Sequence, residues 1–379
     1  MNNKTKSLVF LFLGHLSNDF YPGMVSPLLP IFTVQYGWSM AQAGLLITAM
    51  QISCNISQPV FGIINDHKPT KSFLWIGLIV AGLPFCFVMK IDSLHIMAIA
   101  MILSGIGVGM FHPVSVVAAG QIAHEKRRGI SMALFSSGGH IGFMIAPIVA
   151  VLIIERLGKV YMPLIILPAL IMTLYFIFDK NIAIKESHGF SLHEWLSSLF
   201  MSGRELFILW LVSSFRGIVL LLVGHFLPML AIVRGASYAE SAYFLSASLL
   251  AGLAGMFIGG YLSDIHGQKK VMAITMLISS PLLYAFLHTS GILSIMLLLT
   301  GMASLSSTIP VNIILAQRVN PKLAGMASSL VMGLPFAMGA LTAAPFGILA
   351  DYVGIETAMN VPFILPVLGG ITVFFLKSN

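Results

Sequence analysis

The stretch LFILWLVSSFRGIVLLLVGHFLPMLAIV, residues 206–233, decides the fold class of this chain. Its only charged residue is Arg216, and it is longer than the roughly 20 apolar residues that an α-helix needs to cross a bilayer. Similar stretches fill the sequence: 58% of the 379 residues are hydrophobic, 9% are charged, and the mean hydropathy is +0.96. Soluble domains carry about 25% charged residues. The composition therefore excludes a soluble enzyme, a nucleic-acid-binding protein and a disordered chain, and indicates an all-α integral membrane protein.

Apolar runs broken by charges or turn residues predict twelve transmembrane helices. We expect them at residues 7–34, 40–63, 71–89, 94–122, 129–155, 159–178, 206–233, 238–262, 271–289, 291–317, 323–350 and 356–376. Of the twenty Lys and Arg residues, fifteen then fall in loops on one side of the membrane, four fall on the other side, and Arg216 lies inside a span. Cytoplasmic loops carry the excess of Lys and Arg. We therefore expect a multi-pass protein of the cell inner membrane with both termini in the cytoplasm.

The two halves of the sequence repeat at a constant offset of 198 residues. Leu29-Pro30 aligns with Leu227-Pro228, Gly62 and Asp66 with Gly260 and Asp264, and Ala146-Pro147 with Ala344-Pro345. The repeat predicts an N-terminal six-helix bundle at 1–178, a cytoplasmic linker at 179–205 and a C-terminal six-helix bundle at 206–379. Leu192, Trp195, Leu196, Leu199 and Phe200 recur at helical spacing in the linker, which predicts an amphipathic helix on the membrane surface. A duplicated helical membrane protein is most often a transporter.

Two copies of one loop motif carry a family resemblance. The copies are GIINDHKPTK at 62–71 and GYLSDIHGQKK at 260–270. They resemble the motif of the major facilitator superfamily, in which a Gly is followed by an Asp four residues on and then by a basic turn; Pro69 replaces a Gly of that pattern. A Gly there lets neighbouring helices approach closely, and the Asp can accept hydrogen bonds from a helix N-terminus. The resemblance implies two pseudosymmetric bundles, transport by alternating access, and gating roles for Gly62, Asp66, Lys71, Gly260, Asp264, Gly267 and Lys269.

Three of the predicted helices resemble one branch of that superfamily. The segments are His15-Leu16-x-Asn18-Asp19, Gly107-x-Gly109-x-Phe111-His112-Pro113 and RRGISMALFSSGGHIGFMIAP at 127–147. Together they resemble the fosmidomycin-resistance branch, with His140 where we expect Asn, and this implies drug efflux against protons. Gly142, Ala146 and Pro147 also resemble an antiporter motif, although small residues at these positions would equally serve tight helix packing.

Asp19 is the acidic residue that falls deepest inside a predicted span. It lies twelve residues after Ser7, about 18 Å into a hydrocarbon core of about 30 Å. An ionisable group at that depth is costly and indicates a function. His15 lies four residues earlier and shares its helix face, so the two residues are candidates for proton coupling. A fixed hydrogen-bonded pair is the alternative.

Arg216 is the basic residue that falls deep inside a span, and the offset places it opposite Asn18. A guanidinium can bind a carboxylate or phosphonate through two parallel hydrogen bonds. Arg216 is therefore the first candidate for substrate binding, and neutralising Asp19 is the alternative role. Further substrate-binding candidates are Asn18, His112, His140, His225 and Phe111. No metal or cofactor is expected, because the histidines of a zinc site formed by His15, His112 and His140 lack close spacing.

Phosphate-binding and hydrolase motifs are absent from the sequence, so we expect neither an ATP-driven pump nor an enzyme. We expect a monomeric, proton-coupled secondary transporter that exports a small polar or anionic compound or drug as an antiporter. Its partners are then the small-molecule substrate, protons and the lipid bilayer, and no nucleic acid. The alternatives are a proton symporter that imports a small organic acid and a transport-inactive membrane sensor or scaffold.

Overall fold

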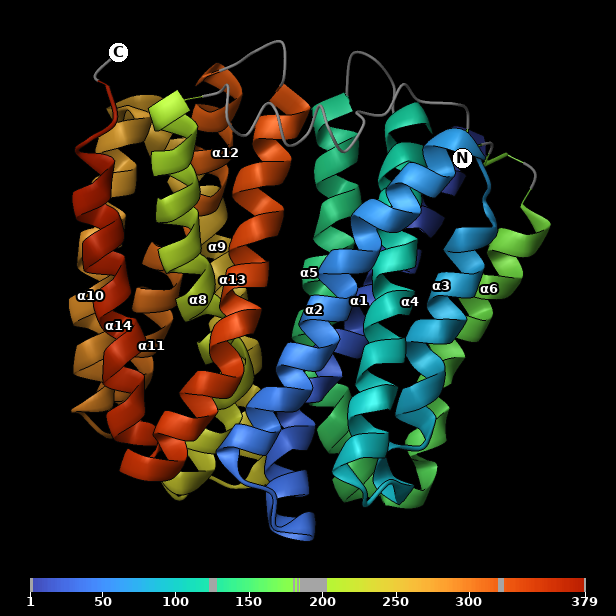
Figure 1. Cartoon of the computed structure of the whole chain (residues 1–379), viewed down its shortest axis with the longest axis horizontal. Helices are drawn as coiled ribbons and strands as arrows, with labels where there is room; N and C mark the ends of the chain where they lie inside the picture. The colour runs from blue at the N-terminus through green and yellow to red at the C-terminus, as the bar shows by residue number, and fades with distance from the viewer. Residues whose placement is uncertain are drawn as a thin grey trace. The chain divides into compact units, whose positions relative to one another are not determined.

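The fold of the chain is entirely helical in the part that the structure describes (Figure 1). This computed structural model describes residues 3–122, 128–179, 181–182, 184, 203–319 and 324–377. The α-helices are α1 (Asn3–Tyr36), α2 (Met40–His67), α3 (Ser72–Gly82), α4 (Leu94–Ile122), α5 (Arg128–Val151), α6 (Leu167–Phe178), α8 (Gly203–Val233), α9 (Tyr238–His266), α10 (Gln268–Leu287), α11 (Gly291–Ser306), α12 (Thr308–Val319), α13 (Ala324–Val353) and α14 (Ile355–Val373). The short helical turns are η1 (Leu83–Cys86), η2 (Val88–Lys90), η4 (Leu152–Leu157) and η5 (Lys159–Ile166).

Ten helical stretches among the described residues are long and apolar enough to cross a membrane. The prediction of an all-α, multi-pass membrane protein is therefore confirmed. Helices α1 and α2 have 34 and 28 residues and are also long enough, but they are not among the ten. Polar side chains such as Asn18 and Asp19 in α1 and Gln51 in α2 make these helices less apolar. The count of twelve spans stays a prediction.

Several predicted spans are less regular than their apolar sequences suggest. The span at 71–89 is regular only as far as Gly82, and 3-10 turns continue it from Leu83, next to Pro84, which has no backbone N–H to donate. The span at 291–317 consists of α11 and α12, which meet at Ser307. Hydropathy predicts where the chain crosses, but it does not predict these breaks.

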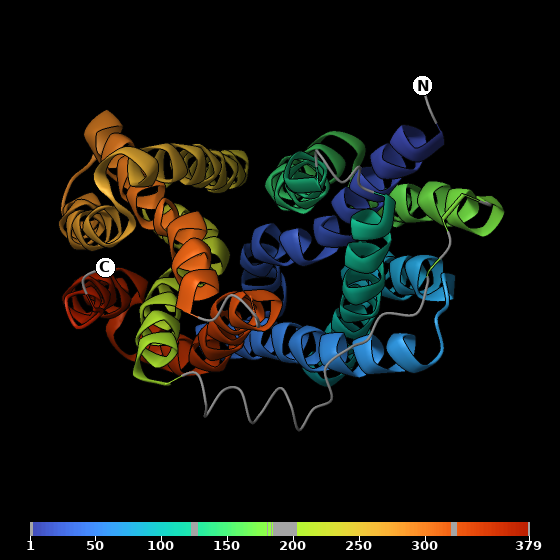
Figure 2. The ribbon, with the colours of Figure 1, turned by 90° about the horizontal axis from the view of Figure 1, so that it is seen from above.

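The chain forms two compact units, and each can be described by itself. The first comprises Met1–Trp38 and Leu45–Gly189, and the second comprises Ser39–Gly44 and Phe190–Asn379. In the first unit α1 packs against α5 and α3 packs against α4; in the second, α8 packs against α13 and α10 packs against α14 (Figure 2). Most of the predicted linker at 179–205, including its amphipathic helix, lies outside the described residues, so the predicted bundle boundaries stay predictions.

Local structure follows the repeat at the start of α2 and of α9. Gly37 and Gly235 both adopt a positive φ, of 66° and 88°. Two residues after each glycine, a serine exchanges hydrogen bonds with the residue three positions on: Ser39 with Gln42 and Ser237 with Glu240. Such reciprocal caps satisfy backbone N–H groups that the first turn of a helix leaves without partners. The same turn and cap therefore begin equivalent helices 198 residues apart.

Helices α1 and α5 pack closely because glycines of α5 face the backbone of α1. A Cβ atom on Gly138 would lie 2.4 Å from the carbonyl oxygen of Phe12, and one on Gly142 would lie 2.1 Å from that of Leu16. Both distances are too short for a real side chain. Small residues bring membrane helices together in this way, and this contact surrounds the candidate site described below.

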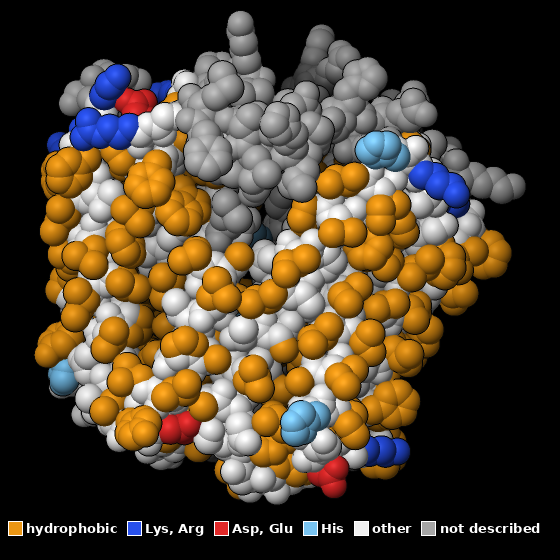
Figure 3. All heavy atoms as spheres, in the orientation of Figure 1, with side chains coloured by type: hydrophobic (Ala, Val, Ile, Leu, Met, Phe, Trp, Pro, Cys, Tyr) orange, Lys and Arg blue, Asp and Glu red, His pale blue; other side chains and the backbone are white. Residues whose placement is uncertain are grey.

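Hydrophobic side chains are spread over the described part of the face seen in Figure 3, and the charged side chains there lie toward its upper and lower edges. Many large apolar residues are exposed on the sides of helices, among them Phe257 of α9, Ile171 of α6 and Ile96 of α4. Soluble proteins rarely expose such extensive apolar surface. The exposed apolar surface of these helices therefore suits contact with lipid rather than with water.

Candidate functional site

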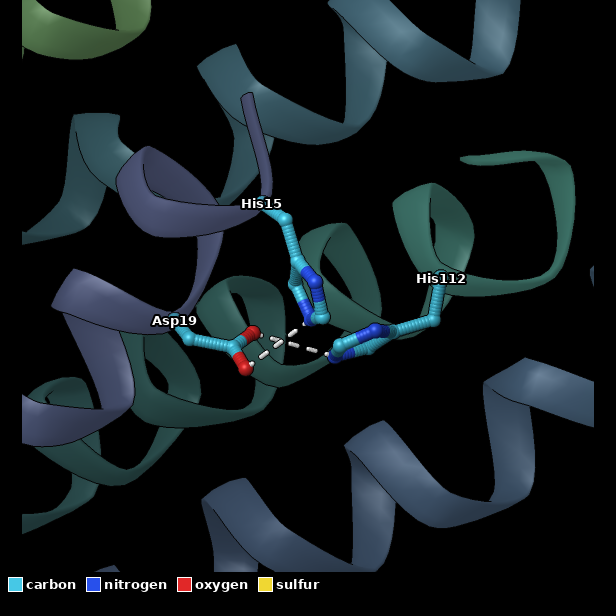
Figure 4. A group of neighbouring side chains, drawn as sticks. All are labelled: His15, Asp19 and His112. Carbon is cyan, nitrogen blue, oxygen red and sulfur yellow. Dashed lines mark ion pairs between the residues drawn. The ribbon is translucent and has the colours of Figure 1, made fainter. Parts of the chain in front are cut away.

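Helices α1 and α4 bring together a carboxylate and two imidazole rings in the first unit (Figure 4). Asp19 of α1 lies between His15, one turn earlier on the same helix, and His112 of α4. The Asp19 Oδ2 atom is 3.2 Å from His15 Nε2, and the Oδ1 atom is 3.1 Å from His112 Nε2. We call these three side chains the His–Asp–His cluster. The predicted pairing of His15 with Asp19 is present in the structure, and His112 is added to it.

The ring of His15 is held in one orientation by α5. Its Nδ1 atom lies 2.9 Å from the backbone carbonyl oxygen of Phe135, and its ring stacks on the Phe135 ring at 4.5 Å between centroids. A carbonyl oxygen only accepts hydrogen bonds, so Nδ1 carries a hydrogen and donates it. In a neutral ring Nε2 then presents its lone pair to the Asp19 carboxylate. The short contact between two acceptors is favourable only when a cation, such as a proton, is shared between them.

Space for the cluster depends on Gly139 of α5. A Cβ atom at this position would lie 2.4 Å from Asp19 Oδ2 and 2.5 Å from His15 Nε2. The sequence analysis included Gly139 in the segment at 127–147 that resembles the fosmidomycin-resistance branch, but gave it no role at the site. The available signal was the Gly138-Gly139 pair inside an apolar span, since small residues let membrane helices approach closely. Gly142, Ala146 and Pro147, which resemble an antiporter motif, lie further along the same helix; Gly142 contacts α1 and Ala146 is fully buried.

Asn18 belongs to the same group of side chains. Its Nδ2 atom donates to Asp19 Oδ1 at 3.0 Å and lies 3.4 Å from His112 Nε2. The residue is fully buried, and its Oδ1 atom has no hydrogen-bond partner among the described residues. Asn18 was predicted as a substrate contact, and the structure shows it oriented toward the carboxylate.

The other predicted residues of this unit lie apart from the carboxylate. His140 is exposed, and its Nδ1 atom lies 3.1 Å from the carbonyl oxygen of Ser136 in its own helix. The three-histidine zinc site considered above is therefore not assembled, because Asp19 takes the place of His140. Phe111 is fully buried, with its ring 6.4 Å from the His15 ring. The Phe111 ring therefore lies beside the His15 ring of the cluster.

Arg216 lies on α8 in the second unit, and only 5% of its surface is exposed. Its Nη1 atom donates to Thr308 Oγ1 and its Nη2 atom donates to Ser213 Oγ, both at 3.2 Å. Both acceptors are neutral, and no acidic side chain pairs with Arg216 in the described part of the chain. A buried charge needs a partner of opposite charge. Among the described residues, Arg216 therefore has only neutral hydrogen-bond partners.

Neutral polar residues that the sequence analysis missed support Arg216. Asn312 of α12 donates through Nδ2 to Ser213 Oγ and, at 3.1 Å, to the carbonyl oxygen of Leu209. The only signal for them was the presence of isolated polar residues in apolar spans, which commonly serve helix packing. His225, also predicted as a substrate contact, is buried in α8.

The residues of the loop motif that we predicted to act in gating lie near the ends of helices. Gly267 adopts a φ of 85° in the turn between α9 and α10, Asp264 is exposed, and the side chain of Asp66 lies outside the described residues. The expected reason for the motif glycines is wrong. A Cβ atom would meet its nearest neighbour at an ordinary 3.6 Å at Gly62 and 4.0 Å at Gly260. The close approach falls on Gly259, where a Cβ atom would lie 2.2 Å from the carbonyl oxygen of Ser307.

Comparison with known proteins identifies relatives along the whole chain. The sequence profile of the Major Facilitator Superfamily matches residues 11–332 and 209–379. The chain is 27% identical to the "Fosmidomycin resistance protein" of Escherichia coli K12, over 96% of this chain and 90% of that protein. It is 26% identical to the "Uncharacterized MFS-type transporter YfnC" of Bacillus subtilis 168, over 98% and 93%. Among solved structures, a bacterial homologue of the human lysosomal transporter Spinster superposes with a TM-score of 0.85 at 14% identity, over 99% of this chain and 97% of that one.

Proposed function

Because this chain belongs to the Major Facilitator Superfamily, we propose that it is a proton-coupled antiporter that exports a small polar or anionic compound or drug by alternating access. In this proposal the monomer spans the cell inner membrane with twelve helices in two six-helix bundles, and both termini are cytoplasmic. The fifteen-to-four distribution of Lys and Arg supports the orientation. The similarity to a fosmidomycin resistance protein supports export.

The observation that carries the proposal is the contact between His15 Nε2 and Asp19 Oδ2. Because the Phe135 carbonyl oxygen holds the hydrogen on His15 Nδ1, one additional proton stabilises the contact, whether it resides on the ring or on the carboxyl group. His112 presents a second ring nitrogen to the same carboxylate. Histidine gains and loses protons near physiological pH. The cluster therefore provides a place where one proton can bind and leave.

The groups around the cluster support this role. Cys54 of α2 is close enough to Asp19 to interact with it electrostatically, and Gly139 of α5 lies against the carboxylate. Neither brings a permanent charge, and among the described residues His15 and His112 are the basic groups that pair with the carboxylate. The side chains of Asp19 and His112 are 20% and 21% exposed, so a proton can reach them. We assign Asp19 and His15 to proton coupling and His112 to the same site.

Arg216 supports an anionic substrate. Its two hydrogen bonds go to hydroxyl groups, and a guanidinium has five N–H donors in a planar fork. The remaining donors suit two oxygen atoms of a carboxylate or phosphonate. We propose that Arg216 holds the anionic group of the substrate, and that Asn18, His112, His140, His225 and Phe111 contribute to recognition in other states of the cycle.

Transport by the purified protein in liposomes tests the proposal. Fosmidomycin is loaded on one side, and pH gradients of both orientations are imposed. An antiporter moves the compound toward the acidic side, whereas a symporter moves it away from that side, and a sensor or scaffold gives no flux in either case. Flux that is independent of both gradients contradicts proton coupling. A resistance assay that compares the growth of cells with and without the gene extends the test from fosmidomycin to other compounds.

A further inference from the structure

We propose that the His–Asp–His cluster also binds a divalent transition-metal ion of the zinc class, and that this ion blocks transport by occupying the place of the proton. The binding itself follows from the geometry of three side chains. The block of transport rests on the function proposed above. The two parts can be tested separately.

The ligand atoms are already close to the spacing that a metal ion requires. One atom each from His15, Asp19 and His112 lie within 4.8 Å of one another, and the two nitrogen–oxygen distances are 3.2 and 3.1 Å. Zinc binds nitrogen and oxygen at about 2.0–2.2 Å in tetrahedral sites, which places neighbouring ligand atoms about 3.3–3.6 Å apart. Small side-chain rotations of His15 and His112 toward each other would complete this arrangement.

The hydrogen bond to Phe135 prepares His15 for metal binding. A histidine ligand usually donates its other ring N–H to a carbonyl or carboxylate group, which fixes the tautomer and the ring orientation. His15 does this already: Nδ1 donates to the Phe135 carbonyl oxygen at 2.9 Å, and Nε2 faces Asp19. The hydrogen bond that would orient His15 as a metal ligand is therefore present before any ion binds.

The chemistry of the ligands selects the class of ion. Two imidazole nitrogens and one carboxylate suit Zn²⁺, Co²⁺ or Ni²⁺, whereas Mg²⁺ and Ca²⁺ prefer sites made of oxygen atoms. The 20% and 21% exposure of Asp19 and His112 leaves room for water or an anionic group as a fourth ligand. The oxygen and ring-nitrogen lone pairs that bind the ion are those that bind the proton, so one excludes the other.

Metal binding is measured on the full-length protein in detergent with no pH gradient. Co²⁺ is the probe, since its visible absorption reports tetrahedral coordination, and Zn²⁺ titration calorimetry gives the affinity. We expect one site per chain that His15→Ala or His112→Ala weakens by at least about tenfold, the lower range for losing a group that supports a metal site. His67→Ala is the matched control, because His67 is an exposed histidine that bonds to its own helix, and it should leave this site unchanged.

Equal Co²⁺ spectra and Zn²⁺ affinities in wild type, His15→Ala and His112→Ala would overturn the proposal, because binding would then come from other histidines. Gel filtration of each variant verifies that it is folded, and His112→Gln retains a polar side chain if His112→Ala does not fold. Transport in liposomes then tests the second part. Micromolar Zn²⁺ should inhibit wild type, and undiminished flux at a Zn²⁺ concentration that saturates the site would refute the block. Zinc binding without any proton-driven flux would count against the proposed function alone.

Discussion

Lys71 and Lys269, which are 198 residues apart, make the same contact in the two units. The Nζ atom of Lys71 donates to the carbonyl oxygens of Ile177 and Asp179, at 3.3 and 2.6 Å, where α6 ends. The Nζ atom of Lys269 donates to the carbonyl oxygens of Phe374 and Leu376, where α14 ends. The last carbonyl groups of a helix lack partners and carry partial negative charge, so an ammonium group stabilises them. The basic residue of each loop motif thus fixes the final helix of its own unit.

Replacing Lys71 with alanine should destabilise the protein by about 1 kcal/mol, the range for a cation at a helix C-terminus. Lys269→Ala should do the same, because the contact is equivalent. Thermal unfolding in detergent measures the effect as a lower Tm. Lys270→Ala is the control, since Lys270 is a neighbouring exposed lysine. If all three variants melted at the wild-type temperature, the contacts would not contribute to stability.

The variant Asp19→Asn should abolish transport driven by a pH gradient while it retains exchange of substrate across the membrane. An amide keeps the shape of the carboxyl group but binds no proton at physiological pH. Gradient-driven uptake and substrate counterflow in the same liposomes separate the two activities. Wild-type uptake driven by the gradient in Asp19→Asn would exclude this residue as the proton carrier.

Substitution Gly139→Ala should impair transport as strongly as loss of a cluster side chain. The added methyl group would meet Asp19 Oδ2 and His15 Nε2 at 2.4 and 2.5 Å, and overpacking of this kind costs about 1–3 kcal/mol. Gly224→Ala is the matched control, because a Cβ atom at Gly224 of α8 meets no atom within 4 Å. Proton-driven flux is the measurement. The idea fails if Gly139→Ala transports as well as Gly224→Ala.

The substitution Arg216→Ala should weaken binding of anionic substrates by about 30-fold or more, since truncating one partner of a buried charge pair costs at least about 2 kcal/mol. Arg216→Lys should recover only part of this, because an ammonium group lacks the planar fork of a guanidinium. Binding of fosmidomycin is measured by calorimetry, with a neutral compound of similar size as the reference. Undiminished affinity in Arg216→Ala would place the anion elsewhere.

The sequence predicted the features that depend on composition and on distance along one helix. Continuous apolar stretches such as 206–233 predicted the membrane fold, and the spacing of four residues predicted that His15 and Asp19 share a helix face. His112 was identified as a candidate, but its contact with Asp19 depends on how α4 packs against α1. The sequence of neither helix specifies that packing.

The supporting contacts of the site were the least predictable. The hydrogen bond from His15 to the Phe135 carbonyl oxygen joins residues 120 positions apart and uses a backbone atom, which every residue possesses. Ser213, Thr308 and Asn312 have side chains that occur throughout membrane helices, so their relation to Arg216 becomes evident only in three dimensions. At Gly260 the sequence predicted a contact that the structure does not have. The motif indicated a close approach of two helices at this residue, and the structure places that approach at Gly259.

The glycine contact between α1 and α5 also limits how this protein can acquire new properties by mutation. At Gly138, Gly139 and Gly142 every other amino acid adds at least one carbon atom where α1 already lies, so these positions offer no neutral path for sequence drift. His112 stands on α4, outside that contact, and its side chain is partly exposed. A library that randomises His112 and leaves the three glycines intact should therefore yield most of the folded variants with altered ion preference.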